Sequence, residues 1–425
     1  MVVIIVLAVL LLGVGVFFAA AKKWFGLGIY NAIWALTLIS CSSDLVQPHY
    51  RLVLTLVTVS VIAVNLGYLL SKYLTPEGLP VPEKQDGAIF NSRLLIGLMG
   101  LAVVIMAVFA VKSLLRFGFD LAAIRAGNNS VSEGSVFSSR LDSVLFYGYA
   151  MPMIYVGAFC LAFNFSQKKK ISFLLLGLEL AAVVLNVLAV AGRSVFIRVI
   201  LILFAAILWR LGMKGGFGKK VIISVLAIGI LFYGVMEVTT LMRNDWEVSF
   251  FQQAMNYIRG AVSHMQYRLG HLPERCFRYG FVTYGGFLYY PLKVLSVFGI
   301  DLNTSNDIMF FMQEYVDIAV GNQTMHYNAL APNVFYYFFD SGWYGVVAFS
   351  LLLGFSAGRS EEMRACPRFF EFVLWATAVY AIVYSPMDGV LWAFRFPTAI
   401  IYCLLLKDLL YVPADCGRIR KWFRL

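Results

Sequence analysis

The sequence predicts an all-α fold, a polytopic helical membrane protein with about eleven transmembrane helices and one large external loop. Its 425 residues are 61% hydrophobic and 13% charged, whereas soluble domains average roughly 45–50% and 25%. The apolar runs last about 16–22 residues, the length with which a helix crosses a hydrocarbon core of ~30 Å. In lipid, only helices and closed barrels satisfy every backbone polar group. Because the runs lack the alternation of barrel strands, we expect helices.

The predicted spans follow one another along the chain with a single large interruption. They cover residues 2–21, 25–42, 52–70, 94–115, 144–165, 171–191, 194–211, 221–238, 343–358, 369–385 and 388–406. Lys22 and Lys23 follow the first span and no basic residue precedes it, so we interpret it as a retained anchor rather than a cleaved signal peptide. The six cysteines are scattered, and we expect no disulfide framework.

Basic residues in the short connections predict the orientation, because they gather on the cytoplasmic side. Most of them follow odd-numbered spans: Lys22, Lys23, Lys72, Lys84, Arg93, Lys168, Lys169, Lys170, Arg210, Lys214, Lys219, Lys220, Arg359, Arg364, Arg368, Arg418, Arg420, Lys421 and Arg424. The N-terminus and the large loop are therefore placed outside, and the C-terminus inside. One link disagrees: the external connection between the fourth and fifth spans carries Lys112, Arg116, Arg125 and Arg140. The net charge of +11 is attributed to this cytoplasmic bias, and no nucleic-acid partner is expected.

The large polar interval divides the chain into three parts. Residues 1–236 form a bundle of about eight spans, 237–342 a large external loop with short helices, and 343–425 three spans with a cytoplasmic tail. The loop holds three of the four histidines and five arginines, so we expect the chemistry there. Residues 282–298 are apolar but contain Pro291 and Lys293, which favours an interfacial or re-entrant helix over a further span.

The turn from Ala191 to Ser194 is a candidate anion site. It is placed on the same outer face as the large loop, and Ser194 can cap the helix that follows. A helix N-terminus beside the guanidinium of Arg193 suits phosphate oxygens, although an arginine extended toward lipid headgroups would look the same. Arg198 lies deeper in apolar sequence, where an arginine needs a functional role or a pairing partner.

A second cluster begins with Tyr257 and Arg259 in the large loop. A helix over Asn256–Leu269 places residues four apart on one face. Further polar candidates follow along the loop: His264, Arg268, Arg275 and Arg278. External arginines do not serve topology, so we expect them to bind a diphosphate or an acidic sugar, or else to pair with Asp245, Glu247 and Glu274.

Three residues are candidate general bases: His264, His326 and Asp340. An imidazole titrates near pH 7 and suits proton transfer, but a solvated loop histidine is equally consistent with His326. Asp340 lies in the stretch Pro332–Gly345, where it serves either as a base or as a cap for the next helix. The histidine spacing matches no metal motif, and we expect no metal and no cofactor.

Three motifs together resemble a known family. They are Gly-Arg-Ser at an outward turn, Tyr-x-Arg-Gly from Tyr257 to Gly260 in a late external loop, and Asn…Asp-x-Gly-x-x-Gly from Asn333 to Gly345 before the next span. This layout, from about residue 90 to 358, resembles the Wzy-type O-antigen polymerases, within the wider O-antigen polymerase and ligase group.

The resemblance implies a GT-C-like fold and a metal-independent glycosyltransferase of the bacterial inner membrane. Its site would face the periplasm and take undecaprenyl-diphosphate-linked oligosaccharides, and a polysaccharide chain-length regulator is an expected partner. Arg193 matches the family's turn arginine, Arg259 its loop arginine, Asn333 its asparagine before the late span, and Asp340 with Gly342 its Asp-x-Gly. Fixed arginines would stabilise the charge of a diphosphate leaving group.

Two alternatives stay open. An O-antigen ligase, which transfers the glycan to lipid A core, resembles this layout but carries a histidine directly before the asparagine. This chain has Pro332 there, with His326 as a possible displaced equivalent. A lipid-linked oligosaccharide flippase is the other alternative, and it would be expected to show paired halves and ionisable residues near mid-membrane.

Overall fold

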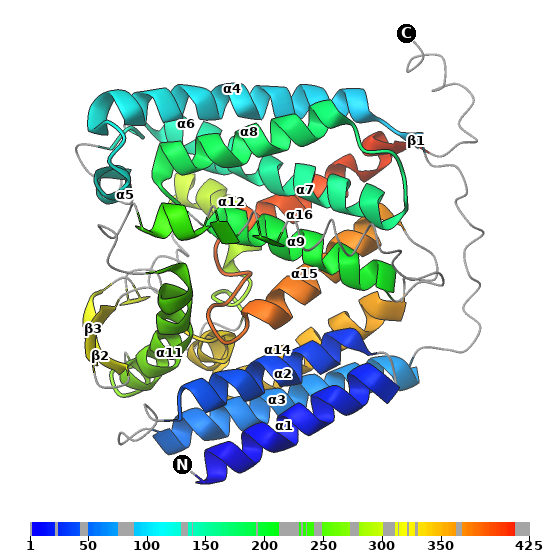
Figure 1. The fold of residues 1–425 in the computed structure, drawn as a ribbon, viewed down its shortest axis with the longest axis vertical. Helices are drawn as coiled ribbons and strands as arrows, with labels where there is room; N and C mark the ends of the chain where they lie inside the picture. The colour runs from blue at the N-terminus through cyan, green and yellow to red at the C-terminus, as the bar shows by residue number, and fades with distance from the viewer. Residues whose placement is uncertain are drawn as a thin grey trace. The chain divides into compact units, whose positions relative to one another are not determined.

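The protein is mainly helical (Figure 1). The computed structural model describes residues 2–21, 24–42, 50–74, 89–128, 135–137, 139–192, 194–211, 229–230, 233–234, 236–241, 249–272, 280–300, 311–312, 314–320, 323–327, 330–362 and 368–412. The helices are α1 (Val2–Ala21), α2 (Phe25–Ser40), α3 (Tyr50–Leu74), α4 (Ser92–Phe117), α5 (Leu121–Asn128), α6 (Arg140–Ser143), the π-helical η1 (Val144–Ala150), α7 (Met151–Ser166), α8 (Phe173–Val190), α9 (Ser194–Leu211), α11 (Phe250–Leu269), α12 (Gly285–Val297), α14 (Asn333–Glu362), α15 (Phe369–Tyr384) and α16 (Arg395–Leu410). The strands are β1 (Ile89–Phe90), β2 (Val316–Val320), β3 (Gln323–Tyr327) and β4 (Tyr411–Val412).

Within the described residues, six helices are long and apolar enough to cross a membrane. They are α1, α3, α4, the continuous helix Leu141–Ser166, α8 and α14, while α2 and α15 are apolar but shorter. The chain is thus a helical protein of the kind that embeds in membranes. Every predicted span overlaps described helical residues. Of the span 221–238, only residues 229–230, 233–234 and 236–238 are described, and they are helical.

Two predicted spans start elsewhere than expected. The ninth, expected from residue 343, belongs to α14, which begins at Asn333 and bends at Ser341 and Gly342. The last, expected from residue 388, begins only at Arg395. The ten residues before it form a loop, because two of its carbonyls accept hydrogen bonds from other elements: Ser385 from the Asn333 N–H at 2.8 Å and Leu391 from the Gly286 N–H at 3.0 Å.

The chain folds into two compact units. Unit 1 contains Met1–Leu79, Gln252–Met363 and Thr377–Pro397, and unit 2 contains Pro80–Phe251, Arg364–Ala376 and Thr398–Leu425. Each unit is assembled from separate stretches of sequence. The greater part of the large loop thus belongs to the same unit as the first three helices, and not to a unit of its own.

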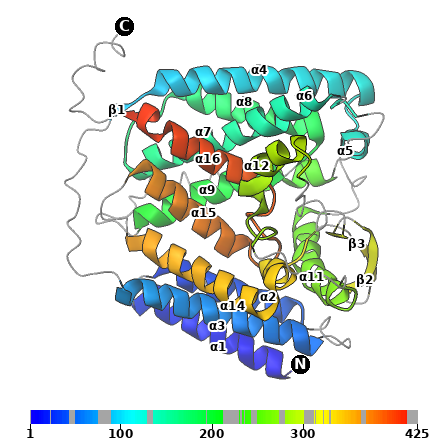
Figure 2. The same cartoon turned by 180° about the vertical axis from the view of Figure 1, so that it is seen from behind.

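In unit 1, the helices α1, α2, α3 and α14 lie side by side (Figures 1 and 2). The α3–α14 contact brings backbones together: a Cβ on Gly354 would collide with the carbonyl of Val64, and one on Gly67 with that of Leu351. The hydroxyls of Ser60 and Ser350 share a hydrogen bond of 2.8 Å in this contact. Small residues permit such close approach between helices in lipid, where dispersion replaces the hydrophobic effect as the source of association.

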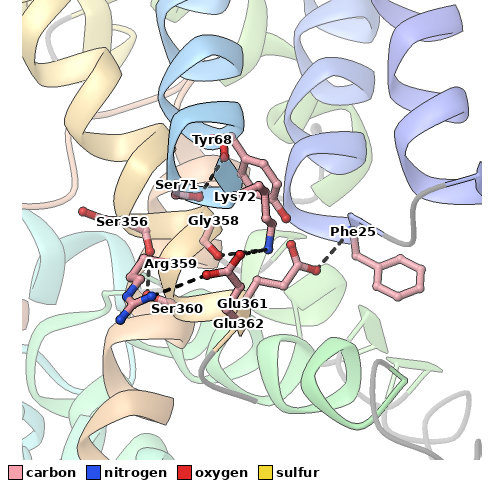
Figure 3. Close-up of polar contacts among 10 residues, drawn as sticks. All are labelled: Phe25, Tyr68, Ser71, Lys72, Ser356, Gly358, Arg359, Ser360, Glu361 and Glu362. Carbon is pink, nitrogen blue, oxygen red and sulfur yellow. Dashed lines mark hydrogen bonds and ion pairs between the residues drawn. The ribbon is translucent and has the colours of Figure 1, made fainter. Parts of the chain in front are cut away.

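A polar cluster closes one end of this bundle (Figure 3). Lys72 on α3 lies 3.5 Å from the Glu362 carboxylate and donates to the Gly358 carbonyl at 3.2 Å. Arg359 lies 3.6 Å from the same carboxylate, and Glu361 accepts from the Phe25 N–H at the start of α2. Lys72 and Arg359, two residues predicted to be cytoplasmic, therefore lie at one end of the bundle.

The large loop contributes α11 and an antiparallel β2–β3 hairpin to unit 1, side by side in both views (Figures 1 and 2). In the hairpin, Val316 pairs with Tyr327 and Val320 with Gln323. The inner face of β2 buries alternate residues, and they pack with Tyr327 against aromatic residues of α11. The predicted helix over Asn256–Leu269 is present, and it extends back to Phe250.

Unit 2 is built around α4, α7, α8 and α9, with α4 lying along α8 (Figure 2). At the end of α8, the carbonyl of Ala189 accepts from Ser113 of α4 and Asn128 of α5, both at 2.8 Å. These bonds position the turn that begins with Ala191, whose φ of 47° is left-handed. Phe90 pairs with Tyr411 in the β1–β4 ladder.

Candidate functional site

The helix α11 carries the first part of the candidate site. Its residues from Gly260 to Leu269 are largely buried and include Ala261, Val262 and Met265. Gly260 is required by close approach, because a Cβ there would lie 2.7 Å from a ring carbon of Tyr327. Tyr257 lies one turn earlier, and its ring meets that of Tyr327 edge to face at 6.4 Å. Arg259, between them in sequence, is half-buried. The hairpin thus packs directly on the Tyr-x-Arg-Gly segment.

His264 is fully buried on the same helix, and both of its ring nitrogens are engaged. Nδ1 lies 2.9 Å from the carbonyl oxygen of Leu330, which can only accept, so Nδ1 carries the proton. Nε2 accepts from Arg268 Nε at 3.0 Å. Burial, together with the nearby Arg268 charge, lowers the pKa of His264 to about 4 despite the opposing Leu330 contact. His264 is therefore a neutral imidazole whose lone pair holds an arginine.

Arg268 is also buried, with 1% of its side chain exposed. Besides His264, it contacts Glu314, donating from Nη1 to the carboxylate at 3.0 Å and from Nη2 to the main-chain carbonyl at 2.6 Å. Its guanidinium lies 4.6 Å from the centre of the Phe311 ring. These contacts account for Arg268 as a buried link between α11 and the hairpin. In this arrangement Nε, Nη1 and Nη2 each donate one hydrogen bond within the protein.

Asp340 ties the late motif to the large loop. Its two carboxylate oxygens accept from the backbone N–H groups of Gly280 at 2.8 Å and Thr283 at 2.9 Å. The side chain thus caps a turn from another part of the sequence, rather than the helix segment that follows it.

Steric constraints explain why two positions of the same motif are glycine. Gly342 has φ 59° and ψ −146°, a region that residues with a Cβ rarely adopt. Gly345 packs against the Tyr337 carbonyl, with which a Cβ would collide. Asn333 is buried at the start of α14, and its side chain donates to Tyr337 at 3.3 Å. The Asn…Asp-x-Gly-x-x-Gly segment therefore forms the bend at Ser341 and Gly342 between the two helical parts of α14.

A carboxylate that was not among the predicted site residues lies beside this motif. Asp388 accepts from the Tyr336 hydroxyl at 2.7 Å and from the Trp392 indole at 3.0 Å. Asp-Gly preceded by Pro386 marks a turn, and this signal could have separated residues 385–394 from the last span. The hairpin also had a signal, since Gly321-Asn322 follows an alternating apolar strand.

In unit 2, the structure shows a partner for Arg198, the predicted site residue within apolar sequence. Its Nη1 donates to the Tyr155 hydroxyl at 3.1 Å, and its guanidinium lies 5.8 Å from the centre of that ring. Arg125 of α5 lies near the turn that precedes α9. Its Nη1 is 3.9 Å from the position that a Cβ on Gly192 would occupy. From the sequence, Arg125 was only a basic residue that disagreed with the predicted orientation.

Several predicted site residues lie outside the described part of the chain. Arg193, Arg275 and Arg278 are among them, so their roles stay predictions. For His326 the structure describes the backbone alone, which pairs with Asp317 in the hairpin. Within the described ranges, His264, Arg268, Tyr257, Arg259, Asn333 and Asp340 all belong to unit 1, and Arg198 belongs to unit 2.

No group of three or more histidine, cysteine or acidic side chains suited to a metal is found among the described residues. Comparison with protein families, with curated proteins and with solved structures finds no match. The class that the fold defines is that of helical proteins embedded in membranes. The function is therefore inferred from the site itself.

Proposed function

We propose that this protein polymerises undecaprenyl-diphosphate-linked oligosaccharide repeats into O-antigen or a related surface polysaccharide at the periplasmic face of the bacterial inner membrane. The fold would be of the GT-C kind with about eleven spans, and a chain-length regulator is an expected partner. The observation that carries the proposal is the joining of two separate motifs in unit 1. Tyr327 packs on Gly260 of the Tyr-x-Arg-Gly segment, and three residues after it Leu330 binds His264, just before Asn333 opens the second motif.

The charges of unit 1 support an outward site. Lys72 and Arg359, predicted to be cytoplasmic, lie at the C-terminal ends of α3 and α14 (Figure 3). The motif residues Asn333 and Asp340 belong to the first third of α14. Arg359 follows Asp340 by 19 residues in α14, a rise of roughly 28 Å along a helix. This is close to the hydrocarbon thickness of ~30 Å, so the two sets of groups lie toward opposite ends of α14.

The chemistry proposed for this site needs fixed positive charge rather than a metal. An acceptor hydroxyl attacks the anomeric carbon of the growing glycan, and the lipid diphosphate leaves. Arg259, on α11 of unit 1, is the proposed diphosphate ligand. For Arg193 the same role stays a prediction from the resemblance. Removing one preorganised donor of this kind typically slows catalysis about 10²–10³-fold.

The test is a gel profile of surface polysaccharide from cells lacking the gene, complemented with wild type, Arg259→Ala or Arg193→Ala. Arg51→Ala is the matched control, because Arg51 is an exposed arginine on α3. A polymerase predicts lipid A core capped with one repeat in the null strain, a ladder with wild type and with the control, and no ladder with Arg259→Ala at equal protein level. Uncapped core with long lipid-linked polymer would instead indicate a ligase, and an unchanged ladder would remove the polysaccharide proposal.

One observation favours the flippase alternative. Glu179 of α8 is buried with 4% exposure, and neither carboxylate oxygen has a hydrogen-bond partner among the described residues. A carboxyl group inside a membrane-spanning helix is a functional candidate by default, for instance as a proton carrier. The same gel separates the two proposals, because cells without a flippase would export no repeat and leave the core uncapped, without polymer.

A further inference from the structure

The helix α8 of unit 2 buries two polar side chains that have no hydrogen-bond partner within the described part of the chain. Glu179 is 4% exposed and Asn186 is fully buried. Neither carboxylate oxygen of Glu179 and neither amide atom of Asn186 is bonded there. The two residues are seven positions apart, so they share the face of α8 that packs on α4 and α7. Buried polar groups of this kind call for an explanation, such as a chemical role.

The Glu179 carboxyl lies at an apolar junction of three helices. A Cβ on Gly157 of α7 would collide with Oε2 of Glu179 and would lie 3.0 Å from the Met99 sulfur of α4. The basic groups of the neighbouring helices lie away from this junction: Arg93, Lys112 and Arg116 are exposed near the ends of α4, Arg125 lies near Gly192, and Arg198 donates to Tyr155. An unpaired carboxylate is far more costly to bury than a neutral acid, so this packing suits the protonated form.

A polar route leads from Glu179 toward one end of α7. The Cys160 thiol is within electrostatic reach of Glu179 and hydrogen-bonding reach of Tyr411. The Tyr411 hydroxyl donates to Oδ1 of Asn164 at 3.3 Å. Tyr411 retains 8% exposure, and the exposed Lys169 lies 5.8 Å from the centre of its ring. The route therefore ends at the lysine-rich turn before α8, which its charge places on the cytoplasmic side.

A proton is the ligand that this setting fits. The neighbours Gly157 and Met99 offer no side-chain oxygen, whereas Mg²⁺ and Ca²⁺ take about six oxygen ligands or more. A proton needs a single carboxyl oxygen, and hydroxyl and thiol groups can pass it on, because each of them both donates and accepts. Ionisable side chains inside membrane helices commonly serve as proton relays.

We propose that Glu179 binds a proton in the interior of unit 2 and exchanges it with the cytoplasmic side through Cys160 and Tyr411. The polymerase reaction proposed above does not use Glu179, so this site is a further activity. In the step, the carboxylic acid gives its proton to the Cys160 sulfur, directly or through one water, as the thiol proton passes to the Tyr411 oxygen. The hydroxyl proton of Tyr411 passes to water at the lysine-rich turn. One proton leaves, and the Glu179 carboxylate remains.

Infrared spectroscopy of the purified full-length protein in nanodiscs tests the site, because the carbonyl band of a protonated carboxylic acid is separate from the band of a carboxylate. Wild type is expected to show this band at neutral pH and to lose it as the pH is raised. Glu179→Gln is expected to lack the band, whereas Asp408→Asn, at an exposed aspartate of α16, should keep it. Isotope-labelled glutamate shifts the band in wild type and so assigns it to a glutamate without any substitution.

Deuterium exchange of the same band tests the route. After transfer into D₂O, Cys160→Ala is expected to slow the shift of the band at least ~10-fold, which is ~1.4 kcal/mol in the barrier. Cys160→Ser keeps a side chain that both donates and accepts, and its rate is expected to stay within about threefold of wild type. Cys41→Ala is the matched control, because it makes the same change at a buried cysteine of unit 1.

Other results would overturn the proposal. Identical spectra of wild type and a folded Glu179→Gln, or no shift of the band with labelled glutamate, would show that Glu179 holds no proton. A band that persists at every pH at which the protein stays folded would assign Glu179 to the fold alone. Equal exchange rates in Cys160→Ala, Cys160→Ser and wild type would remove the route through Cys160.

Discussion

Arg268 donates its Nε–H to Nε2 of His264 across 3.0 Å. This bond, with the Leu330 carbonyl on the opposite nitrogen, requires the neutral imidazole with its proton on Nδ1. Protonating His264 would place a second positive charge beside a buried guanidinium. The pair therefore acts as a fixed polar joint between α11 and the segment that leads into α14, and its energetics can be tested.

The first prediction concerns pH. The pKa of His264 is lowered from 6.5 to about 4 in the folded protein, so between these values the unfolded chain binds a proton that the folded protein does not. Folding stability is then lost as pH falls from 6.5 toward 4, by up to about 3 kcal/mol in total. Thermal midpoints in detergent should fall more steeply over this window for wild type than for His264→Gln. His271→Gln, at an exposed histidine, should behave as wild type, and equal slopes for all three proteins would contradict the prediction.

The second prediction concerns the buried guanidinium. Arg268→Lys keeps the charge but cannot reach His264 and both Glu314 oxygens at once, because an ammonium lacks the planar fork. We expect a loss of about 2–4 kcal/mol in unfolding free energy, as for other broken buried networks. Glu314→Gln should cost less, since the Glu314 carboxylate is 70% exposed and its main-chain carbonyl still accepts. Arg51→Lys is the control, and a wild-type midpoint for Arg268→Lys would refute the assignment.

The third prediction separates structure from catalysis at Asp340. Asp340→Ala removes the acceptors of two backbone N–H groups, each worth about 1–3 kcal/mol when left unsatisfied. We expect a lower melting midpoint and reduced membrane abundance in Asp340→Ala, whereas Asp408→Ala should be neutral. A variant that is as stable as wild type yet inactive would show that Asp340 is a catalytic base instead.

The fourth prediction tests the α3–α14 packing. Gly354→Leu places a side chain where the Val64 carbonyl lies, and overpacking of this kind typically costs about 1–3 kcal/mol. The matched change Gly100→Leu introduces the same side chain into α4, where nothing lies within 4 Å of the new Cβ. We expect only Gly354→Leu to lower the melting midpoint in detergent. Equal midpoints for the two variants would show that this helix contact contributes little.

Much of the fold follows from local sequence. The apolar runs that became α1, α3, α4 and α8 were predicted from length and hydropathy, because burial in lipid depends on each run by itself. The helix over Asn256–Leu269 was predicted within a few residues of α11. The boundaries that failed, at Asn333 and Arg395, depend on hydrogen bonds from residues far along the chain.

The sequence by itself determined that this is a helical membrane protein, and it singled out the charged and polar residues of the large loop. Only the tertiary structure decided what those residues do. His264, Arg268 and Asp340 each bind groups at least four and up to 66 residues away, so their side chains serve the fold before any substrate. The sequence predicts that the last helix begins at Asp388. In the structure long-range backbone hydrogen bonds keep that segment from being helical, and Asp388 lies beside Tyr336 and Trp392. The length of an apolar run depends only on consecutive residues. The pairing of polar groups depends on which distant segments the fold brings together.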